Sequence, residues 1–245
     1  MAHDLRHDVA EYTHFVLGWE KYVVRIGATH GKERTERRLL HANNWRVLRR
    51  ASTIRRMHTD TALGALHGRR SIREFTPREV SREEIETMLD AAVTAPNHRL
   101  TQPWRFYVLG PEARRAYGLA LGNRKAKKIE DTAAADRMRN NVANEHMALP
   151  LMIAVAMVEN ENPEIREEDA SATMMAVQNL AIVAVALGLG THIKTGAVMQ
   201  DPAARVAAGV RDGERIVALI NVGEPTVVPP AKERKSAASL TTWLP

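Results

Sequence analysis

The chain has 245 residues, of which 44% are hydrophobic, and this is enough for one sizeable core with or without an extension. It contains no cysteine, so disulfide bonds, thiolate metal sites and a cysteine nucleophile are excluded. The N-terminus lacks the basic, apolar and small-residue order of a signal peptide, which favours a cytoplasmic enzyme.

The net charge of +6 is concentrated in residues 1–56, which hold 12 Lys or Arg against 6 Asp or Glu. The other 189 residues hold 23 basic and 23 acidic side chains. A nucleic-acid-binding protein acting through the first segment is therefore one hypothesis, and salt-sensitive DNA or RNA binding would be its signature. The balanced charge of the rest and the lack of a nucleic-acid motif disfavour it.

Residues 1–56 combine scattered aromatic side chains with basic clusters and show no sustained helical or strand period. They are either a true basic arm or codons placed before a natural start at Met57, and we favour the second. In both cases we expect poor order in 1–56, and we treat residues 57–245 as one domain.

The first chemical signal of this domain is Gly68–Phe75, which reads Gly-Arg-Arg-Ser-Ile-Arg-Glu-Phe. Three guanidinium groups and a hydroxyl within five positions are typical of an anion site, because their donors suit phosphate oxygens. An isolated Arg-Arg-Ser is more often a solvated turn, so the interpretation depends on the elements that come after it in the chain.

A helix comes next. Ser81 and Glu84 form the pattern of a capping box, Val80 and Ile85 that of a hydrophobic staple, and Pro96 ends the helix near Ala95. A polar loop then leads to a strand predicted at 105–109, and residues 111–149 predict two helices. The charged residues 124–131 are assigned to the second of these helices as a solvent-facing cover.

The second half contains the most apolar segments. Residues 151–158 predict a central strand that is covered on both faces. Residues 170–187 are apolar nearly all round, but Gln178, Asn179 and the acidic start favour a buried helix over a membrane span. Its small residues would let other helices approach closely, as at a dimer core, and Gln178 and Asn179 would form helix–helix hydrogen bonds.

Gly188 and Gly190 end this helix, and residues 191–196 predict a tight polar loop. Asp201 and Pro202 predict the start of a short helix, and residues 216–222 predict another buried strand. Residues 240–244 could add an edge strand. The order of elements predicts one α+β domain without repeats.

Three motifs in this order resemble the FMN-dependent nitroreductase family, in particular its small bacterial NAD(P)H nitroreductases. They are Arg69–Phe75; Ala95-Pro-Asn-His98 with Gln102-Pro-Trp104; and Gly188-Leu-Gly190 with Lys194-Thr-Gly-Ala197 and Gly223-Glu-Pro225 behind it. One motif would be a weak signal, but three in order across residues 60–245 are strong.

The resemblance implies a mixed central sheet of four or five strands wrapped by helices, with the long buried helix at the core of a homodimer. It also implies one FMN in each of two clefts at the subunit boundary. NADH or NADPH would reduce the flavin, and a nitroaromatic, quinone or similar acceptor would reoxidise it by a ping-pong mechanism. No Ser/His/Asp set, carboxylate pair or metal-spaced His cluster is evident, and flavin chemistry needs none.

By position, the resemblance assigns Arg69, Arg70 and Ser71 to FMN, His98 to the flavin of the partner subunit, and Ile193, Lys194 and Thr195 to the flavin-lining loop. We expect Arg73 and Arg234, with Lys232 as an alternative, to help hold the phosphate, and Gln102 to meet the ribityl hydroxyls. On composition alone His98 would be a surface residue, and Trp104 is expected in the core. The nicotinamide nucleotide is assigned to a segment at the end of the buried helix: Val183, Ala184, Val185, Ala186, Leu187 and Gly188.

Two departures from the family pattern concern the pocket. Thr94 stands where similar proteins often have an arginine, and Ile193-Lys194-Thr195 replaces a more usual Trp-Arg-Ser. A specialised flavoenzyme on the same scaffold, such as an ene reductase, a dehalogenase or a flavin-cleaving enzyme, is therefore the alternative within flavoproteins.

Overall fold

The computed structural model describes residues 15–17, 20–22 and 62–245. Contacts divide the chain into two compact units, Met1–Met57 and His58–Pro245. In the first unit, β1 (Phe15–Leu17) pairs antiparallel with β2 (Glu20–Tyr22), a pairing that the sequence did not indicate. The other expectations for residues 1–56, including their order and the start at Met57, lie outside the described residues.

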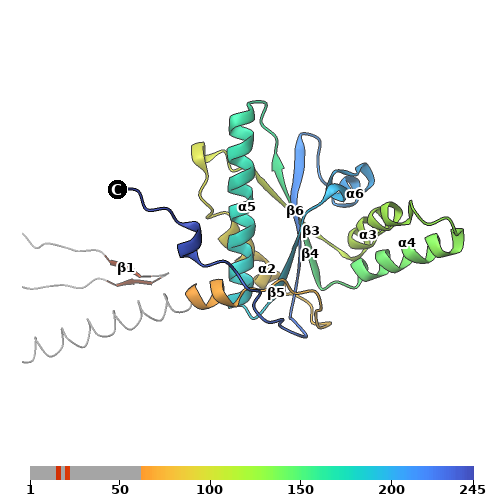
Figure 1. Ribbon diagram of the computed structural model, residues 1–245, viewed down its shortest axis with the longest axis horizontal. Helices are drawn as coiled ribbons and strands as arrows, with labels where there is room; N and C mark the ends of the chain where they lie inside the picture. The colour runs from red at the N-terminus through yellow and green to blue at the C-terminus, as the bar shows by residue number, and fades with distance from the viewer. Residues whose placement is uncertain (1–14, 18–19, 23–61) are drawn as a thin grey trace, which may run out of the picture. The chain divides into compact units, whose positions relative to one another are not determined.

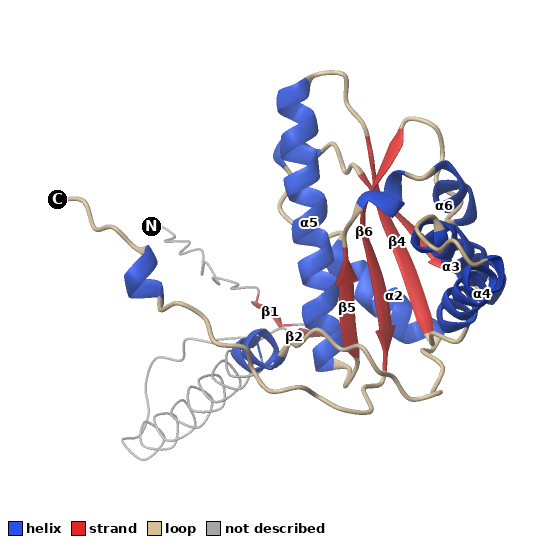
Figure 2. Cartoon of the chain, turned by 45° about the vertical axis from the view of Figure 1, so that its right-hand side comes forward, coloured by secondary structure: helices blue, strands red, loops and turns tan. Residues whose placement is uncertain are grey.

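The second unit is built on a four-stranded sheet with the order β3-β4-β6-β5 (Figures 1 and 2). Its strands pair antiparallel, and a parallel bridge between Ser71 and Thr191 is added at the β5 edge, so the sheet is mixed only there. The central strands are almost wholly buried, as predicted. The four strands of the sheet are β3 (Trp104–Leu109), β4 (Leu151–Val158), β5 (Gly190–Lys194) and β6 (Glu214–Gly223).

Helices cover both faces of the sheet, as Figure 1 shows. α2 (Arg82–Ala92) and α5 (Pro163–Ala186) pack on one face around Ile153, Val155 and Ile220. On the other face the core includes Tyr117 of α3 and Ala204 of α6. The bounds on that side are α3 (Pro111–Ala126), α4 (Thr132–Met147) and α6 (Pro202–Ala207). The predicted α+β architecture, a central sheet wrapped by helices, is confirmed.

Several local predictions are confirmed by hydrogen bonds. The amide of Glu84 donates to the Ser81 hydroxyl at 3.2 Å, and the Ser81 amide donates to the Glu84 carboxylate at 2.8 Å, which completes the capping box of α2. Asp201 caps α6 by accepting from the Ala203 amide. Trp104 is buried at the start of β3, as expected.

The helix α5 is apolar because one side of it belongs to the core. Its buried residues recur at helical spacing and contact the sheet and α2: Asp169, Ala172, Thr173, Ala176, Val177, Leu180, Ala181 and Ala184. By length and composition alone this helix could cross a membrane, but packing in the core already explains its composition. Asn179 donates to the Ala91 carbonyl at 3.2 Å, which confirms the expected helix–helix hydrogen bond, whereas Gln178 is exposed.

Three expectations were wrong. Residues 191–194 are not a loop but belong to β5, where they pair with β6 and gain backbone hydrogen bonds that a local pattern does not reveal. Residues 240–244 form no strand; a short 3-10 helix, Ala237–Leu240, is followed by an exposed end because no strand lies alongside it in the described residues. The charged stretch 124–131 lies at the end of α3 and in the turn before α4.

Candidate functional site

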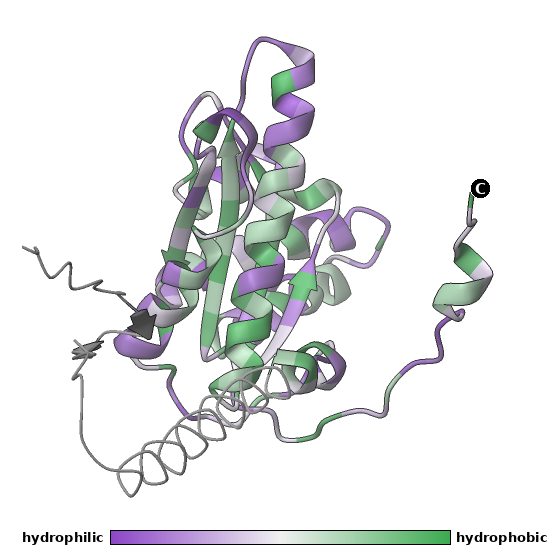
Figure 3. Ribbon diagram, turned by 90° about the vertical axis from the view of Figure 1, so that its left-hand side faces the viewer, coloured by the Kyte–Doolittle hydropathy of each residue, from purple (hydrophilic) through white to green (hydrophobic). Residues whose placement is uncertain are grey.

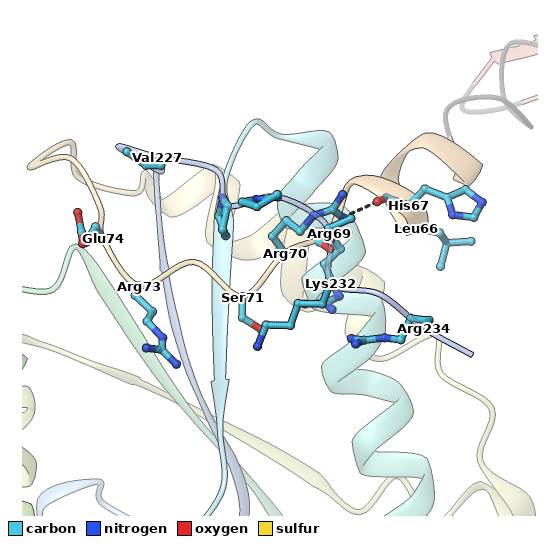
Figure 4. A pocket seen from close by; sticks show the side chains of 13 residues that line it. Leu66, His67, Arg69, Arg70, Ser71, Arg73, Glu74, Val227, Lys232 and Arg234 are labelled. Carbon is cyan, nitrogen blue, oxygen red and sulfur yellow. Dashed lines mark hydrogen bonds between the residues drawn. The ribbon is translucent and has the colours of Figure 1, made fainter. Parts of the chain in front are cut away.

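A cavity of about 710 Å³ lies between the Arg69–Glu74 segment and the C-terminal tail (Figure 4). The first segment follows a helical stretch, residues 62–68, and the tail follows β6. Five basic side chains and one carboxylate line the cavity: Arg69, Arg70, Arg73, Lys232, Arg234 and Glu74. Its remaining walls come from Leu66, His67, Ser71, Val227, Pro229, Pro230 and Ala231.

The Arg69–Arg73 segment is held against the edge strand β5. Ile72 is only 2% exposed, and its amide donates to the Thr191 carbonyl at 2.9 Å. Ser71 forms a parallel bridge with the same threonine. Because Ile72 points into the core, its neighbours Ser71 and Arg73 are left exposed on the cavity side.

The three arginines do not behave alike. The Nη1 of Arg70 donates to the carbonyls of His67 at 2.5 Å and of Arg69 at 2.9 Å. This side chain therefore supplies hydrogen bonds to free carbonyls at the end of the preceding helical stretch. Its Nε is buried and has no hydrogen-bond partner among the residues that the structure describes. Arg69 and Arg73 form no ion pair within the described residues, and in Figure 4 Arg73 projects away from Arg69. These two side chains therefore keep their donors for a ligand.

Lys194 stands at the end of β5 and is half-buried. Burial lowers the pKa of Lys194, the charge of Lys125 lowers it further, and Glu145 acts in the opposite sense. No residue that the structure describes accepts a hydrogen bond from this ammonium or forms an ion pair with it. A partly desolvated cation without a partner is a binding group for an anion or for developing negative charge.

His192, two residues earlier on the same side of β5, is also half-buried. Burial lowers its pKa, and the charges of Lys194 and Arg73 add to this effect. Lys194 and Arg73 are thus both close enough to His192 for their charges to lower its pKa, although Lys194 does not line the main cavity. The end of β5 and the Arg69–Arg73 segment therefore carry positive charge on both sides of this histidine.

The loop that carries His98 and Gln102 lies elsewhere in the chain. His98 Nδ1 is 3.0 Å from Glu168 Oε1, near the start of α5, and Arg99 binds the same carboxylate. Gly68, beside the cavity, faces Val185 near the other end of α5. About 17 helical residues separate these points, or roughly 25 Å at 1.5 Å per residue. Within one chain the structure therefore does not bring His98 and Gln102 to the cavity.

This loop is held in a strained shape. Arg99, Leu100 and Gln102 all have positive φ, which costs about 1 kcal/mol or more for each non-glycine residue. Asn97 offsets part of this cost by accepting from the Gln102 amide at 2.6 Å, and Thr101 donates to the buried Asp169 at 2.5 Å. Strained backbone of this kind is common at functional sites, and the sequence did not indicate it.

The end of α5, which was assigned to the nicotinamide nucleotide, borders a second cavity of about 170 Å³. Val185 and Gly188 line this cavity, and Arg70 separates it from the larger one because it lines both. These are the two residues of the segment Val183–Gly188 that line this second cavity. Dinucleotide-sized ligands require several times this volume, so the segment can contribute an edge but not a complete site.

Sequence reasoning missed part of the cavity wall. His67, Pro229 and Pro230 line it and were not selected. Lys232 was only an alternative, although it lines the cavity together with Arg234. The tail residues are far from Arg69 in the sequence, and the one available signal was the Pro-Pro pair before a basic cluster.

The described residues form an antiparallel sheet covered by helices, with an arginine-lined cavity whose donors suit an anionic ligand. The model of the Nitroreductase family matches residues 66–224, so the chain belongs to the nitroreductase family. The expected enzyme class, a nitroreductase-like oxidoreductase, is confirmed by this membership.

The individual relatives agree with the family. YfhC of Bacillus subtilis, provisionally named an NAD(P)H nitroreductase, is 34% identical over 169 residues, which are 69% of this chain and 87% of YfhC. A nitroreductase-like protein from Bacillus cereus has a TM-score of 0.66 and 26% identity, over 75% of this chain and 95% of its own. A Desulfovibrio desulfuricans nitroreductase homologue solved in complex with FMN has a TM-score of 0.56 and 27% identity, over 75% and 96%.

Proposed function

We propose that this protein is an FMN-dependent oxidoreductase that passes reducing equivalents from NADH or NADPH to a nitroaromatic, quinone or similar acceptor. The observation that carries the proposal is the cavity of about 710 Å³ with five basic side chains and one carboxylate. This volume falls in the range of roughly 300–1,000 Å³ usual for ligand sites. The surplus of cations suits the phosphate dianion of FMN.

The residues present divide the work of holding FMN. Arg69 and Ser71, with Lys232 and Arg234 from the tail, would bind the phosphate, while Arg70 fixes the backbone that carries them. Lys194 would stabilise the negative charge that reduction places on the ring system. When bound, FMN would supply the redox chemistry between the nicotinamide and the acceptor, and a flavin that serves both in turn would give ping-pong kinetics.

The protein is proposed to act as a homodimer in the cytoplasm. Two features support a second copy: the outward side of α5 leaves Met174 and Met175 about 40% exposed, and the His98 loop lies far from the cavity of its own chain. In a dimer, His98 and Gln102 would reach the cavity of the partner subunit. The site would then be complete only where two copies meet.

The test is the absorption spectrum of the purified full-length protein. We expect a yellow protein with flavin bands that NADH or NADPH bleaches under argon, and that regains its colour when a nitroaromatic or a quinone is added. Colourless protein that takes up no added FMN would contradict the proposal. Sedimentation of the same sample measures the dimer separately.

A further inference from the structure

A buried carboxylate fixes the loop of residues 97–102 to the start of α5. In Figure 3 the first turns of this helix are mostly hydrophilic and its middle is mostly hydrophobic, and Asp169 stands at this change in the sequence. Asp169 is only 2% exposed and forms no ion pair within the described residues. Burying a carboxylate costs free energy unless a hydrogen bond compensates it. The Thr101 hydroxyl supplies such a bond, at 2.5 Å.

The bond to Asp169 sets the direction of the hydrogen bonds inside the loop. A carboxylate has acceptors but no donor, so the single hydroxyl proton of Thr101 goes to Asp169 rather than to Asn97 Oδ1, which is 3.3 Å away. The Thr101 oxygen then accepts from Asn97 Nδ2 at 3.1 Å. With its nitrogen committed in this way, Asn97 turns its Oδ1 to the Gln102 amide, which donates to it at 2.6 Å.

This network holds the backbone in a shape that it would otherwise leave. Gln102 has a φ of 45°, and Arg99 and Leu100 have φ angles of 64° and 50°. Positive φ is unfavourable for residues with a Cβ, so the loop needs a contact that fixes it. On the outer side, Glu168 accepts from His98 Nδ1 and from Arg99 Nε, and these bonds lower the pKa of Glu168. Such exposed contacts contribute little, which leaves the buried carboxylate as the main anchor.

We infer that Asp169 is a positioning residue for this loop. Through Thr101 and Asn97 it fixes the backbone at Gln102. In the proposed dimer, the loop then presents Gln102 and His98 to the cavity of the second copy in one conformation. The inference rests on the proposed function for the second copy and its cofactor. It goes further, because it assigns part of the cofactor affinity to a carboxylate that is buried in its own chain.

The Thr101 hydroxyl allows a test that leaves Asp169 in place. Thr101→Val keeps the shape of the side chain but removes the proton, whereas Thr101→Ser keeps the proton. The reporter is hydrogen exchange at the Gln102 amide in the full-length protein, followed by mass spectrometry of a peptide spanning residues 97–104. We expect Thr101→Val to speed this exchange about tenfold or more, because a hydrogen bond to a charged group is lost. Thr101→Ser should exchange at the wild-type rate.

Thr173→Val is the matched control. The Thr173 hydroxyl is buried and also bonds to Asp169, but it donates to the backbone carbonyl, at 2.7 Å. This variant loses a hydrogen bond to the same residue outside the loop network, so exchange at Gln102 should stay unchanged even where the protein becomes less stable.

Asp169→Ala removes the acceptor and should speed the exchange by a factor similar to that of Thr101→Val. The double variant should be no faster than either single variant, because both changes remove one bond. Should Asp169→Ala fail to fold, the comparison of Thr101→Val, Thr101→Ser and Thr173→Val decides.

The affinity for FMN, measured by the quenching of flavin fluorescence, is the second readout. Thr101→Val should weaken FMN binding about tenfold, because the free energy that held the loop must now be supplied on binding. Thr101→Ser and Thr173→Val should retain the wild-type affinity. A general loss of stability would lower the affinity of Thr173→Val as well, so this pair separates positioning from folding.

The two readouts separate this inference from the proposed function. Unchanged exchange at Gln102 in Thr101→Val, or equal acceleration in Thr173→Val, would overturn the positioning role. Faster exchange with unchanged FMN affinity would also overturn it, because the loop would then be held without serving the cofactor. If the wild-type protein binds no FMN, the proposed function fails, and exchange at Gln102 alone decides whether Asp169 positions the loop.

Discussion

At the scale of single residues, Lys194 is where burial and charge indicate chemistry most clearly. It is half-buried and has no partner among the described residues, while burial and the charge of Lys125 both lower its pKa. Such an ammonium gains more from a negative ligand than a solvated lysine does, because less water must be displaced.

We therefore predict that Lys194→Gln lowers the reduction potential of the bound flavin by roughly 30–60 mV. This corresponds to losing one charged hydrogen bond in a two-electron couple. Redox titration against a reference dye measures the shift. Lys127→Gln, the exposed control, should leave the potential in place, and an unchanged potential and unchanged FMN affinity in Lys194→Gln would exclude the role.

His146 makes a second residue-scale prediction. It is buried on α4, its Nδ1 donates to the Val142 carbonyl at 2.8 Å, and burial lowers its pKa below 6.5. Below pH 6.5 the unfolded chain therefore binds a proton at this histidine more readily than the folded chain does. The contribution of His146 to the free energy of unfolding is complete above pH 6.5 and is lost as the pH falls below it.

Urea unfolding at pH 5.5 and 7.5 should show this loss. His146→Gln should reduce this loss of free energy of unfolding by up to about 1.4 kcal/mol per pH unit, which is the limit for one titrating group. His192, whose pKa burial also lowers, contributes in the same direction, so His192→Gln provides a comparison. An unchanged pH dependence in both variants would mean that other groups control acid stability.

At the scale of elements, the edge strand β5 positions the arginine segment. Gly190 begins this strand, and a Cβ there would lie 2.3 Å from Cγ1 of Ile72, the residue that anchors the segment. Side chains never approach so closely, so one of the two backbones would have to move.

We predict that Gly190→Ala destabilises the protein by about 1–3 kcal/mol and weakens FMN binding, because the segment carrying Arg69 shifts with Ile72. Ile72→Ala in the same chain should restore part of the affinity by removing Cγ1. Gly64→Ala, where nothing lies within 4 Å, is the control and should be neutral or stabilising. Thermal unfolding and flavin fluorescence together measure both effects.

The element scale also shows how far the sequence can predict this fold. Capping chemistry and apolar runs are local, so the cap at Ser81 and the strand at residues 151–158 were identified correctly. The apolar part of α5 was also identified, but the helix begins seven residues earlier than predicted, at Pro163. β5 was mistaken for a loop because its hydrogen bonds go to β6, which lies beyond α6 in the chain and outside any local pattern. The cations of the site were identified from composition. That Lys232 and Arg234 lie on one wall of the cavity and the arginines of Arg69–Arg73 on the other depends on the path of the tail after Pro225, and no local pattern predicts this path.

At the scale of the whole molecule, one chain separates groups that the proposed reaction needs together. The Arg69 cavity and the His98 loop lie at opposite ends of α5, roughly 25 Å apart. In the proposed twofold dimer, the His98 loop of one copy would reach the cavity of the other, and symmetry would repeat this contact at both sites. Each active site would then draw residues from two chains.

This arrangement predicts complementation between two defective chains. Arg69→Ala and His98→Ala homodimers should each have low NADPH oxidation activity. When the two variants are unfolded, mixed in equal amounts and refolded, half of the dimers are mixed, and each of these has one intact site and one with both defects. The mixture should therefore recover about a quarter of the wild-type activity. Activity no greater than the average of the two parent variants would show that Arg69 and His98 do not serve one shared site.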